Sequence, residues 1–366
     1  MSESIPVLKA KNLEVRRGGA IILNVPFLLI PKGEILSLIG PNGAGKTTLL
    51  QTLSYLLKLF QGEIFFKGER VNSNHSVFEY RRKLAMVFQE PLLFDTTVFD
   101  NVASGLKIRG MKRQEIHRIV REHLDRFGIS HLVHRSARTL SGGEAQRTSL
   151  ARAFAIQPEI LLLDEPFASL DPPSRESLIE DLERILRQTR TTTIFATHDR
   201  LEALRFSDRI GVMNGGKILQ IGTPGEVMNH PVDEFVASFV GVETVLTGKV
   251  IKRDGGTFLV SISGKEIETV GEANLGEAVI LCIRPENVTL SIHSSKEVTS
   301  ARNIFMGKIV KITSLGLFQK VQLDCGFPLV AYVTNHSLEG LSLREGKEVK
   351  ASFKATAIHV VRKGER

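Results

Sequence analysis

The sequence predicts an α/β domain followed by a small all-β barrel domain, and two observations lead to this expectation. Over residues 1–240, short apolar segments alternate with amphipathic helical patterns, which is typical of α/β domains with parallel strands at the core. Over residues 241–366, short β-patterned segments follow one another, separated by turns rich in glycine or asparagine. A length of 366 residues is ample for two domains.

Four strands of the first domain are recognised as apolar segments bounded by turn or polar residues. They are Ile35–Gly40, Leu84–Gln89, Ile160–Asp164 and Thr192–Thr197. The third is apolar without alternation, as expected for a strand that is buried on both faces. Amphipathic helices are expected over Lys112–Phe127, Glu144–Ile156 and Ser174–Gln188. The expected arrangement is therefore a parallel sheet covered by helices.

The second domain has a strand pattern almost throughout. Its candidate strands are Thr247–Ile251, Thr257–Ile262, Ala278–Ile283, Gly307–Ile312, Lys320–Leu323, Leu329–Val333 and Glu348–Lys354. Short strands of this kind predict an OB-like barrel. The segments 247–251 and 306–310 read Thr-Gly-Lys-Val-Ile and Met-Gly-Lys-Ile-Val, which raises the hypothesis of two related halves. Chance similarity between short hairpin sequences is the alternative.

Composition and charge argue against several classes of protein. Hydrophobic residues make up 42% and charged residues 24%, which is ordinary for a globular chain. No segment reaches about 18 consecutive apolar residues, and the first residues lack the pattern of a signal peptide, so a cytosolic location is expected. Cys282 and Cys325 do not form a metal-binding pair. The net charge of +8 fits anionic ligands, but no basic tail for nucleic acid is present.

Residues 40–47 match a phosphate-binding loop, the P-loop, in full: Gly40-Pro41-Asn42-Gly43-Ala44-Gly45-Lys46-Thr47. The P-loop leaves a predicted strand and enters a predicted helix over Thr48–Leu57, which disfavours an ordinary glycine-rich turn. Its glycines allow backbone N–H groups to approach phosphate oxygens at a helix N-terminus. We expect Lys46 to reach the β- and γ-phosphates and Thr47 to bind Mg²⁺.

Polar side chains end the other three predicted strands of this domain: Gln89, the pair Asp164-Glu165, and His198. Ligands of open α/β sheets lie beyond the carboxyl ends of the strands. Asp164 is the candidate Mg²⁺ ligand, and Glu165 is the candidate base for an attacking water. Gln89 is expected to contact Mg²⁺ or that water, and His198 the γ-phosphate. Taken alone, Gln89 and His198 are ordinary polar residues at strand ends. They are considered site residues because four successive predicted strands end at polar groups of this kind.

The segment Leu140-Ser141-Gly142-Gly143-Glu144-Ala145-Gln146-Arg147 resembles the signature motif of ATP-binding cassette (ABC) ATPases. The other motifs follow in the order of that family, including Ser169-Leu170-Asp171 between Glu165 and His198. The resemblance covers roughly residues 5–240 and implies a P-loop NTPase domain that binds ATP and Mg²⁺. It implies nucleotide contacts from the P-loop and from Thr48, Ser141, Gly142, Gly143, Glu144 and Asp171.

In the ABC family, two nucleotide-binding domains stack head to tail, and the signature of one closes over the ATP in the P-loop of the other. The start of the predicted helix Glu144–Ile156 fits this role, because a helix N-terminus attracts phosphate. Since the chain has one P-loop, the resemblance implies a homodimer.

Two positions depart from the family pattern. Arg17 occupies the place where the family usually has an aromatic residue that stacks on adenine, although a guanidinium also stacks on a ring. Glu144 replaces the more common Gln of the signature. The first departure leaves open whether a side chain stacks on adenine. The sequence suggests no function for the second.

The second domain resembles the accessory β-barrel of many ABC importer ATPases, which Cys282-Ile283-Arg284-Pro285-Glu286 fits. Within it, Ser300-Ala301-Arg302-Asn303 and Phe353-Lys354-Ala355-Thr356-Ala357 resemble a molybdate-binding module. The resemblance implies an oxyanion site in which Arg302 and Lys354 supply charge, while Ser300 and Thr356 donate hydroxyl hydrogen bonds. The alternative is a barrel that serves only dimerisation.

The expected function is that of the ATP-hydrolysing subunit of an ABC importer at the cytoplasmic face of the membrane. It would act on separate transmembrane permease subunits, with a substrate-binding protein delivering molybdate or tungstate. Sulfate, iron, polyamine or sugar remain alternative cargos. A soluble ABC ATPase acting on nucleic acid or the ribosome is disfavoured, because the chain lacks a long coiled-coil insertion and a second cassette. Permease docking is predicted over Glu90–Arg109, through Pro91, Leu92, Leu93 and Phe94.

Overall fold

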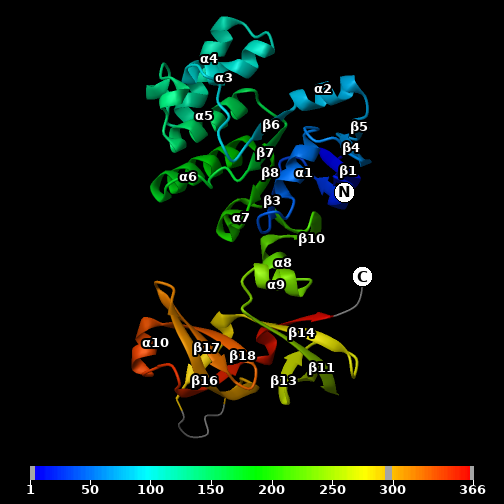
Figure 1. Ribbon diagram of the computed structural model, residues 1–366, viewed down its shortest axis with the longest axis vertical. Helices are drawn as coiled ribbons and strands as arrows, with labels where there is room; N and C mark the ends of the chain where they lie inside the picture. The colour runs from blue at the N-terminus through cyan, green and yellow to red at the C-terminus, as the bar shows by residue number, and fades with distance from the viewer. Residues whose placement is uncertain (1–4, 293–298, 363–366) are drawn as a thin grey trace. The chain divides into compact units, whose positions relative to one another are not determined.

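The computed structural model describes residues 5–292 and 299–362. Internal contacts divide the chain into two compact units, Met1–Pro224 and Gly225–Arg366 (Figure 1). The division precedes residue 241, where the sequence changes to a strand pattern, because the short helices α8 (Pro224–Asn229) and α9 (Glu234–Phe239) lie between the two positions. Within the described residues, no helix combines the length and the apolar character that crossing a membrane requires.

A six-stranded sheet forms the centre of the first unit, in the order β10-β9-β3-β8-β7-β6. Its strands are β3 (Ile35–Ile39), β6 (Leu84–Val87), β7 (Ile160–Asp164), β8 (Thr192–Thr197), β9 (Arg209–Asn214) and β10 (Lys217–Gly222). All four predicted strands are present and run parallel, β9 is parallel to β3, and β10 is antiparallel to β9. The strands β3, β6, β7 and β8 therefore end at the same edge, which is called the carboxyl edge below.

A second, antiparallel sheet was not predicted from the sequence. It has the order β2-β1-β4-β5, with β1 (Leu8–Arg17), β2 (Ala20–Ile30), β4 (Gln61–Phe66) and β5 (Glu69–Arg70). The burial of β1 alternates, but its pairing with β2 and with β4 shifts register, which interrupts the simple period of two. The buried face of this sheet shares a core with the central sheet and helix α1 (Lys46–Leu53).

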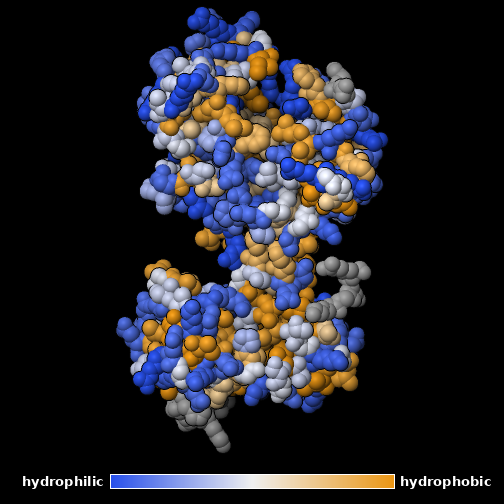
Figure 2. Space-filling model, in the orientation of Figure 1, coloured by the Kyte–Doolittle hydropathy of each residue, from blue (hydrophilic) through white to orange (hydrophobic). Residues whose placement is uncertain are grey.

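The remaining helices of the first unit are α2 (Asn74–Arg82), α3 (Val98–Ile108), α4 (Arg113–Arg126), α5 (Gly142–Ala155), α6 (Pro172–Thr189) and α7 (Arg200–Phe206). Helices α3, α4 and α5 contact one another and form a helical group at the top of the view in Figure 1. Their apolar faces join a second core that includes residues of β7 and α6. The visible surface of each unit is a mosaic of hydrophilic and hydrophobic residues (Figure 2).

The second unit contains two five-stranded antiparallel sheets, in the orders β13-β12-β11-β14-β20 and β15-β19-β16-β17-β18. The first contains β11 (Thr244–Asp254), β12 (Thr257–Ile262), β13 (Lys265–Val270), β14 (Ala278–Ile283) and β20 (Ile358–Arg362). The second contains β15 (Thr289–Ser291), β16 (Asn303–Ser314), β17 (Phe318–Asp324), β18 (Pro328–Thr334) and β19 (Glu348–Phe353). Besides α9 and most of α8, the unit contains the 3₁₀ turns η3 (Pro285–Asn287) and η4 (Ala355–Ala357) and the helix α10 (Asn335–Gly340).

The two sheets repeat one pattern, which supports the hypothesis of two related halves. In the first sheet, the long strand β11 pairs with β12 and with β14. In the second sheet, the long strand β16 pairs in the same way with β17 and with β19. The register shifts at corresponding points, between Val250 and Lys252 and between Ile309 and Lys311. The fifth strands are exchanged, because β15 follows β14 but pairs with β19, while β20 follows β19 but pairs with β14.

Hydrogen bonds at the starts of the two long strands join the halves. The side-chain oxygen of Asn303 accepts from the N–H of Glu268 at 2.8 Å, and its amide nitrogen donates to the carbonyl of the same residue at 2.8 Å. At the corresponding position, the hydroxyl oxygen of Thr244 accepts from the N–H of Val330 at 3.0 Å. Because both halves also share one apolar core, the exchange makes them a single folded unit.

Candidate nucleotide and anion sites

The P-loop connects β3 to α1 at the carboxyl edge. Gly45 precedes the helix in the left-handed conformation, with φ +99°, and no side chain caps the helix N-terminus. A Cβ atom at Gly40 would lie 2.3 Å from the carbonyl oxygen of Met213, so this position requires glycine. The uncapped N–H groups of the first turn are therefore available to an anion such as a phosphate.

Lys46 is buried, with 5% of its residue surface exposed, and its ammonium group lies inside the P-loop. Nζ donates to the carbonyl oxygens of Gly40 at 2.9 Å and Pro41 at 3.2 Å. It also lies 3.3 Å from Oε1 of Glu165. The cation is thus held between the P-loop and the end of β7, where a bound phosphate would compete for it.

Thr47 and Asp164 lie together at the same edge. The Thr47 hydroxyl donates to Oδ1 of Asp164 at 2.9 Å, and Asp164 is only 4% exposed. Burial raises the pKa of Asp164 above its ordinary value, against the opposing hydrogen bond from Thr47. A buried carboxylate beside a hydroxyl oxygen fits the all-oxygen ligand set that Mg²⁺ prefers.

Glu165 follows Asp164 and has a positive φ of 44°. Its N–H donates to the carbonyl of Ala196 on β8 at 2.9 Å, which fixes this turn between two neighbouring strands. Its Oε2 lies 2.8 Å from Nδ1 of His198, while Oε1 faces Lys46. The structure therefore brings together the predicted residues of the ends of β3, β7 and β8.

Gln89 is placed differently. β6 ends at Val87, and Gln89 follows it with an exposed side chain. The register of β6 and β7 places Gln89 at the carboxyl edge, opposite the position of Glu165. Among the described residues, no hydrogen bond connects the Gln89 amide with Thr47, Asp164 or Glu165. The contact of Gln89 with Mg²⁺ or the attacking water therefore stays a prediction.

A turn between β9 and β10 also supports the P-loop, and sequence reasoning missed it. The N–H of Gly216 donates to the carbonyl of Ala44 at 3.0 Å, and its carbonyl accepts from the N–H of Asn24 at 2.8 Å. A Cβ atom at Gly216 would lie 2.3 Å from the carbonyl oxygen of Ile22. The signal in the sequence was the pair Gly215-Gly216, which is typical of an ordinary hairpin turn and does not reveal its partners.

The signature segment begins helix α5, and its Glu144 acquires a structural explanation. Ser141 is the N-cap, and its hydroxyl oxygen accepts from the N–H of Glu144 at 3.3 Å. Oε2 of Glu144 accepts in return from the N–H of Ser141 at 2.7 Å, which completes a capping box. The hydrogen bond from the Ser141 backbone lowers the pKa of Glu144. The helix start that includes Gly142 and Gly143 is thereby fixed.

Asp171 caps the next helix along this side of the unit. Its Oδ2 accepts from the N–H of Ser174 at 3.2 Å at the start of α6. A Cβ atom at Gly143 would lie 3.4 Å from that of Ser174, so the starts of α5 and α6 are neighbours. Within the described part of the chain, no hydrogen bond or ion pair joins the signature to the P-loop.

Arg17 ends β1 at the tip of a hairpin, where it pairs with Ala20 of β2. Its side chain is exposed. The neighbouring Arg16 instead stacks its guanidinium 3.9 Å from the centroid of the Phe60 ring. Stacking of Arg17 on adenine therefore stays a prediction.

The predicted oxyanion residues of the second unit are all exposed. Asn303 pairs with Phe353, so the preceding Arg302 and the following Lys354 meet at the same end of the β16–β19 ladder. Among the described residues, neither cation has an ion pair or a hydrogen-bonding partner. Thr356 lies in η4, two residues after Lys354, on the wall of a cavity of about 250 Å³ that Arg284 and His359 also line. Ser300 precedes Arg302 by two residues.

The corresponding end of the β11–β14 ladder carries charges that are paired. Glu243, which matches Arg302 in this alignment, forms an ion pair with Lys320 and accepts from the Tyr332 hydroxyl at 2.5 Å. Arg284, which matches Lys354, donates to the carbonyl of Met228. The two halves therefore differ in the charges and charge pairing at the strand end where the anion site is predicted.

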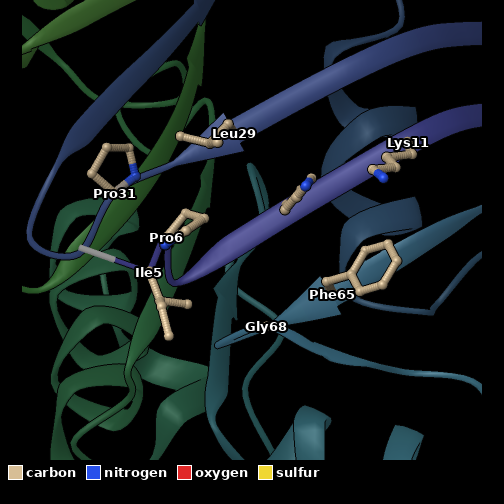
Figure 3. A pocket seen from close by; sticks show the side chains of 8 residues that line it. Ile5, Pro6, Lys11, Leu29, Pro31, Phe65 and Gly68 are labelled. Atoms are coloured by element: carbon tan, nitrogen blue, oxygen red, sulfur yellow. The ribbon is translucent and has the colours of Figure 1, made fainter. Parts of the chain in front are cut away.

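A larger hollow of about 690 Å³ lies on the outer face of the antiparallel sheet (Figure 3). Ile5, Leu29 and Phe65 line it together with Lys9 and Lys11. No predicted site residue lines it, so its size alone does not make it the functional site.

Comparison with known proteins agrees with this geometry. The family model described as ABC transporter matches residues 24–168, and the TOBE domain model matches residues 299–360. The chain is 40% identical to a molybdate/tungstate import ATP-binding protein of Pyrococcus horikoshii over 333 residues, covering 90% of this chain and 93% of the relative. It is 36% identical to a spermidine/putrescine import ATP-binding protein of Borreliella afzelii over 366 residues, covering 98% and 99%.

A third relative, a trehalose/maltose import ATP-binding protein of Thermococcus litoralis, is 35% identical over 343 residues, covering 91% of each chain. Among solved structures, cbiO1 of Clostridium perfringens, part of the ABC transporter complex cbiONQ, matches with a TM-score of 0.57 and 30% identity. That match covers 65% of this chain and 95% of the other. The chain therefore belongs to the ABC transporter family, as an ATP-binding ATPase subunit of the import type with a C-terminal TOBE domain.

Proposed function

We propose that this ATPase drives uptake of molybdate or tungstate through separate membrane permease subunits, working as a homodimer at the cytoplasmic face of the membrane. The observation that carries the catalytic part is the position of Glu165 between Lys46 and His198 at the carboxyl edge. Thr47 and Asp164 would hold Mg²⁺, which when bound neutralises phosphate charge.

In this proposal, the residues around the P-loop divide the work of hydrolysis. The P-loop N–H groups and Lys46 bind and orient the phosphates, with Thr48 and Arg17 as further nucleotide contacts. The carboxylate of Glu165 accepts the proton of the attacking water, and His198 holds that carboxylate in place and faces the γ-phosphate. Gln89, at the neighbouring strand end, contacts Mg²⁺ or the water once ATP is bound.

The dimer is proposed because, within the described residues, no hydrogen bond or ion pair joins the signature to the P-loop of the same chain. The start of α5, where Ser141 and Gly142 are exposed and Gly143 is half-buried, would close over ATP bound by the second copy. Glu144 supports that helix start through its capping box, and Asp171 is placed beside it by the contact of α5 with α6.

Permease docking is proposed for the segment that follows Gln89. Leu92 and Phe94 are 60% and 57% exposed, whereas Leu93 is half-buried. Exposed apolar side chains of this kind mark interaction surfaces. Leu92→Glu is expected to reduce transport by membrane vesicles about tenfold while basal ATPase activity stays within twofold. Unchanged transport would show that docking does not use this segment.

The cargo is proposed from two observations. The relatives include molybdate/tungstate import proteins, and the barrel presents two exposed cations, Arg302 and Lys354, at one strand end. An oxyanion bound there, with hydroxyl groups of Ser300 and Thr356 nearby, would report intracellular cargo to the ATPase. Relatives named for polyamine and sugar import favour a second candidate, an importer of another cargo with a structural barrel.

Calorimetric titration of the full chain with tungstate, molybdate and sulfate tests the cargo proposal. Tight binding of tungstate or molybdate, with sulfate at least tenfold weaker, is expected. If none of the three binds, the oxyanion site is refuted and the second candidate is favoured. The assignment as an import ATPase does not depend on this result.

A further inference from the structure

Arg175 connects helix α6 with the turn that carries His198. It follows the N-cap Asp171 by four residues, and its N–H donates to the Asp171 carbonyl at 2.9 Å. Its Nη2 lies 2.5 Å from Oδ2 of Asp199 and 2.6 Å from Oε1 of Glu202. Its Nε lies 3.1 Å from the same oxygen of Glu202. One guanidinium thus contacts two carboxylates at the start of α7.

The carboxylates need this cation, because Glu202 is only 6% exposed. A buried carboxylate is stable in its charged form only when it is paired and hydrogen-bonded. Hydrogen bonds to Glu202 and Asp199 raise the pKa of Arg175 above its ordinary value. Burial raises the pKa of Asp199, but the hydrogen bonds from Arg175 and from the Leu201 N–H outweigh it and lower the pKa overall.

The same carboxylates fix the residues on either side of His198. Oε2 of Glu202 accepts from the Thr197 hydroxyl at 2.5 Å, and the Thr197 hydroxyl oxygen accepts from the N–H of Asp199 at 3.0 Å. His198 lies between these two residues, and its Nδ1 is 2.8 Å from Oε2 of Glu165. Arg175, His198 and Glu165 line the same cavity of about 170 Å³.

We propose that Arg175 is a positioning residue for ATP hydrolysis. It holds the turn 197–199 against α6 so that His198 keeps the Glu165 carboxylate oriented. The Arg175 guanidinium bonds to carboxylates and not to the P-loop among the described residues. Removing it should therefore lower the rate of hydrolysis and leave nucleotide affinity unchanged. The inference rests on the roles proposed above for Glu165 and His198.

The chain offers a matched control in Arg205. This residue joins the same two helices from the outer side, because its Nη1 lies 2.6 Å from Oε1 of Glu176 and its Nε 2.7 Å from Oε2 of Glu183. Its side chain is 35% exposed, close to the 37% of Arg175. Arg205→Gln therefore removes an ion pair between α6 and α7 that does not include the turn 197–199.

The test measures kcat and KM for ATP, nucleotide Kd with a fluorescent ATP analogue, and thermal unfolding of the full chain. Arg175→Gln is expected to lower kcat about 10- to 100-fold with Kd within about twofold, because a misplacement of about 1 Å costs about 10²-fold. Arg175→Lys should recover part of this loss, and Arg205→Gln should leave kcat within about twofold. Equal kcat values for Arg175→Gln and Arg205→Gln would overturn the inference.

Two further variants separate positioning from stability and from the proposed site itself. The double variant Arg175→Gln/Glu202→Gln no longer leaves a buried charge unpaired, so its thermal unfolding should recover toward that of the original chain. Positioning predicts that kcat stays low, whereas recovery of kcat together with stability would contradict it. Glu165→Gln, measured in parallel, must lose hydrolysis; if it does not, the proposed catalytic site fails independently of Arg175.

Discussion

The carboxyl edge of the six-stranded sheet and the strand end of the barrel at Arg302 and Lys354 both present cations, but in different surroundings. At the carboxyl edge, Lys46 is 5% exposed and is held by two carbonyl oxygens and Glu165. At the barrel, both cations are exposed and are unpaired among the described residues. The cation of the first site is already held in position by groups of the protein. The two cations of the second site lack such partners among the described residues, so an anionic ligand would have to supply them.

The barrel contains its own internal comparison. At the strand end with Glu243 and Arg284, the charges already have partners in the same unit. At the equivalent strand end, Arg302 replaces an acid and Lys354 keeps the positive charge, so the local charge is doubly positive. The difference between the halves shows that a shared fold does not give the two ends the same ligand preference.

The largest effect on ligand affinity is expected at the buried cation, Lys46. Lys46→Ala should lower ATP affinity about 10²-fold, since a hydrogen bond with a charged group contributes about 1.5–3 kcal/mol. Titration with a fluorescent ATP analogue measures this change. Lys32→Ala, at an exposed lysine of the same unit, serves as the control and should bind ATP normally. An unchanged ATP affinity in Lys46→Ala would show that this buried cation does not bind the phosphates, and its contrast with the exposed cations of the barrel would no longer hold.

A smaller effect is expected at the exposed cations. Arg302→Ala and Lys354→Ala should each weaken tungstate binding about tenfold, and the binding should weaken further as salt rises, because exposed charges are screened. The control is Arg284→Ala at the equivalent strand end, which should leave tungstate binding within twofold. If Arg284→Ala weakens binding as much as Arg302→Ala does, the two halves are not distinguished by their charges.

A third effect, on stability and not on ligand binding, concerns the first unit. His123 on α4 is 4% exposed, and its Nδ1 lacks a hydrogen-bonding partner among the described residues. Burial, and secondarily the neighbouring Arg126, lower its pKa to about 4. The unfolded chain therefore takes up a proton below about pH 6.5 that the folded chain does not, which removes about 3 kcal/mol of stability between pH 6.5 and 4.

His123→Leu should accordingly flatten the loss of stability over this pH range, as measured by urea unfolding at several pH values. His134→Gln, at an exposed histidine, should leave the slope unchanged. A slope that persists in His123→Leu would assign the acid sensitivity to other groups.

The motifs predicted the carboxyl edge well because parallel strands bring their ends to one side by geometry alone. Asp164, Glu165 and His198 needed only the strand pattern to be placed near the P-loop. The antiparallel sheet was missed because register shifts in β1 disturb its alternation. Arg175, Asp199 and Glu202 were missed because their contacts join segments 24 and 27 residues apart, which no local pattern reveals.

The central claim, that the carboxyl edge hydrolyses ATP through Glu165, is tested most directly by single-turnover hydrolysis of pre-bound ATP in the full chain. Glu165→Gln should hydrolyse about 10²- to 10⁴-fold more slowly than the original chain while binding ATP with similar affinity. Glu180→Gln, an exposed carboxylate on α6, should behave like the original chain. Hydrolysis by Glu165→Gln at the original rate would contradict the account, because Glu165 would then not be the group that accepts the proton of the attacking water.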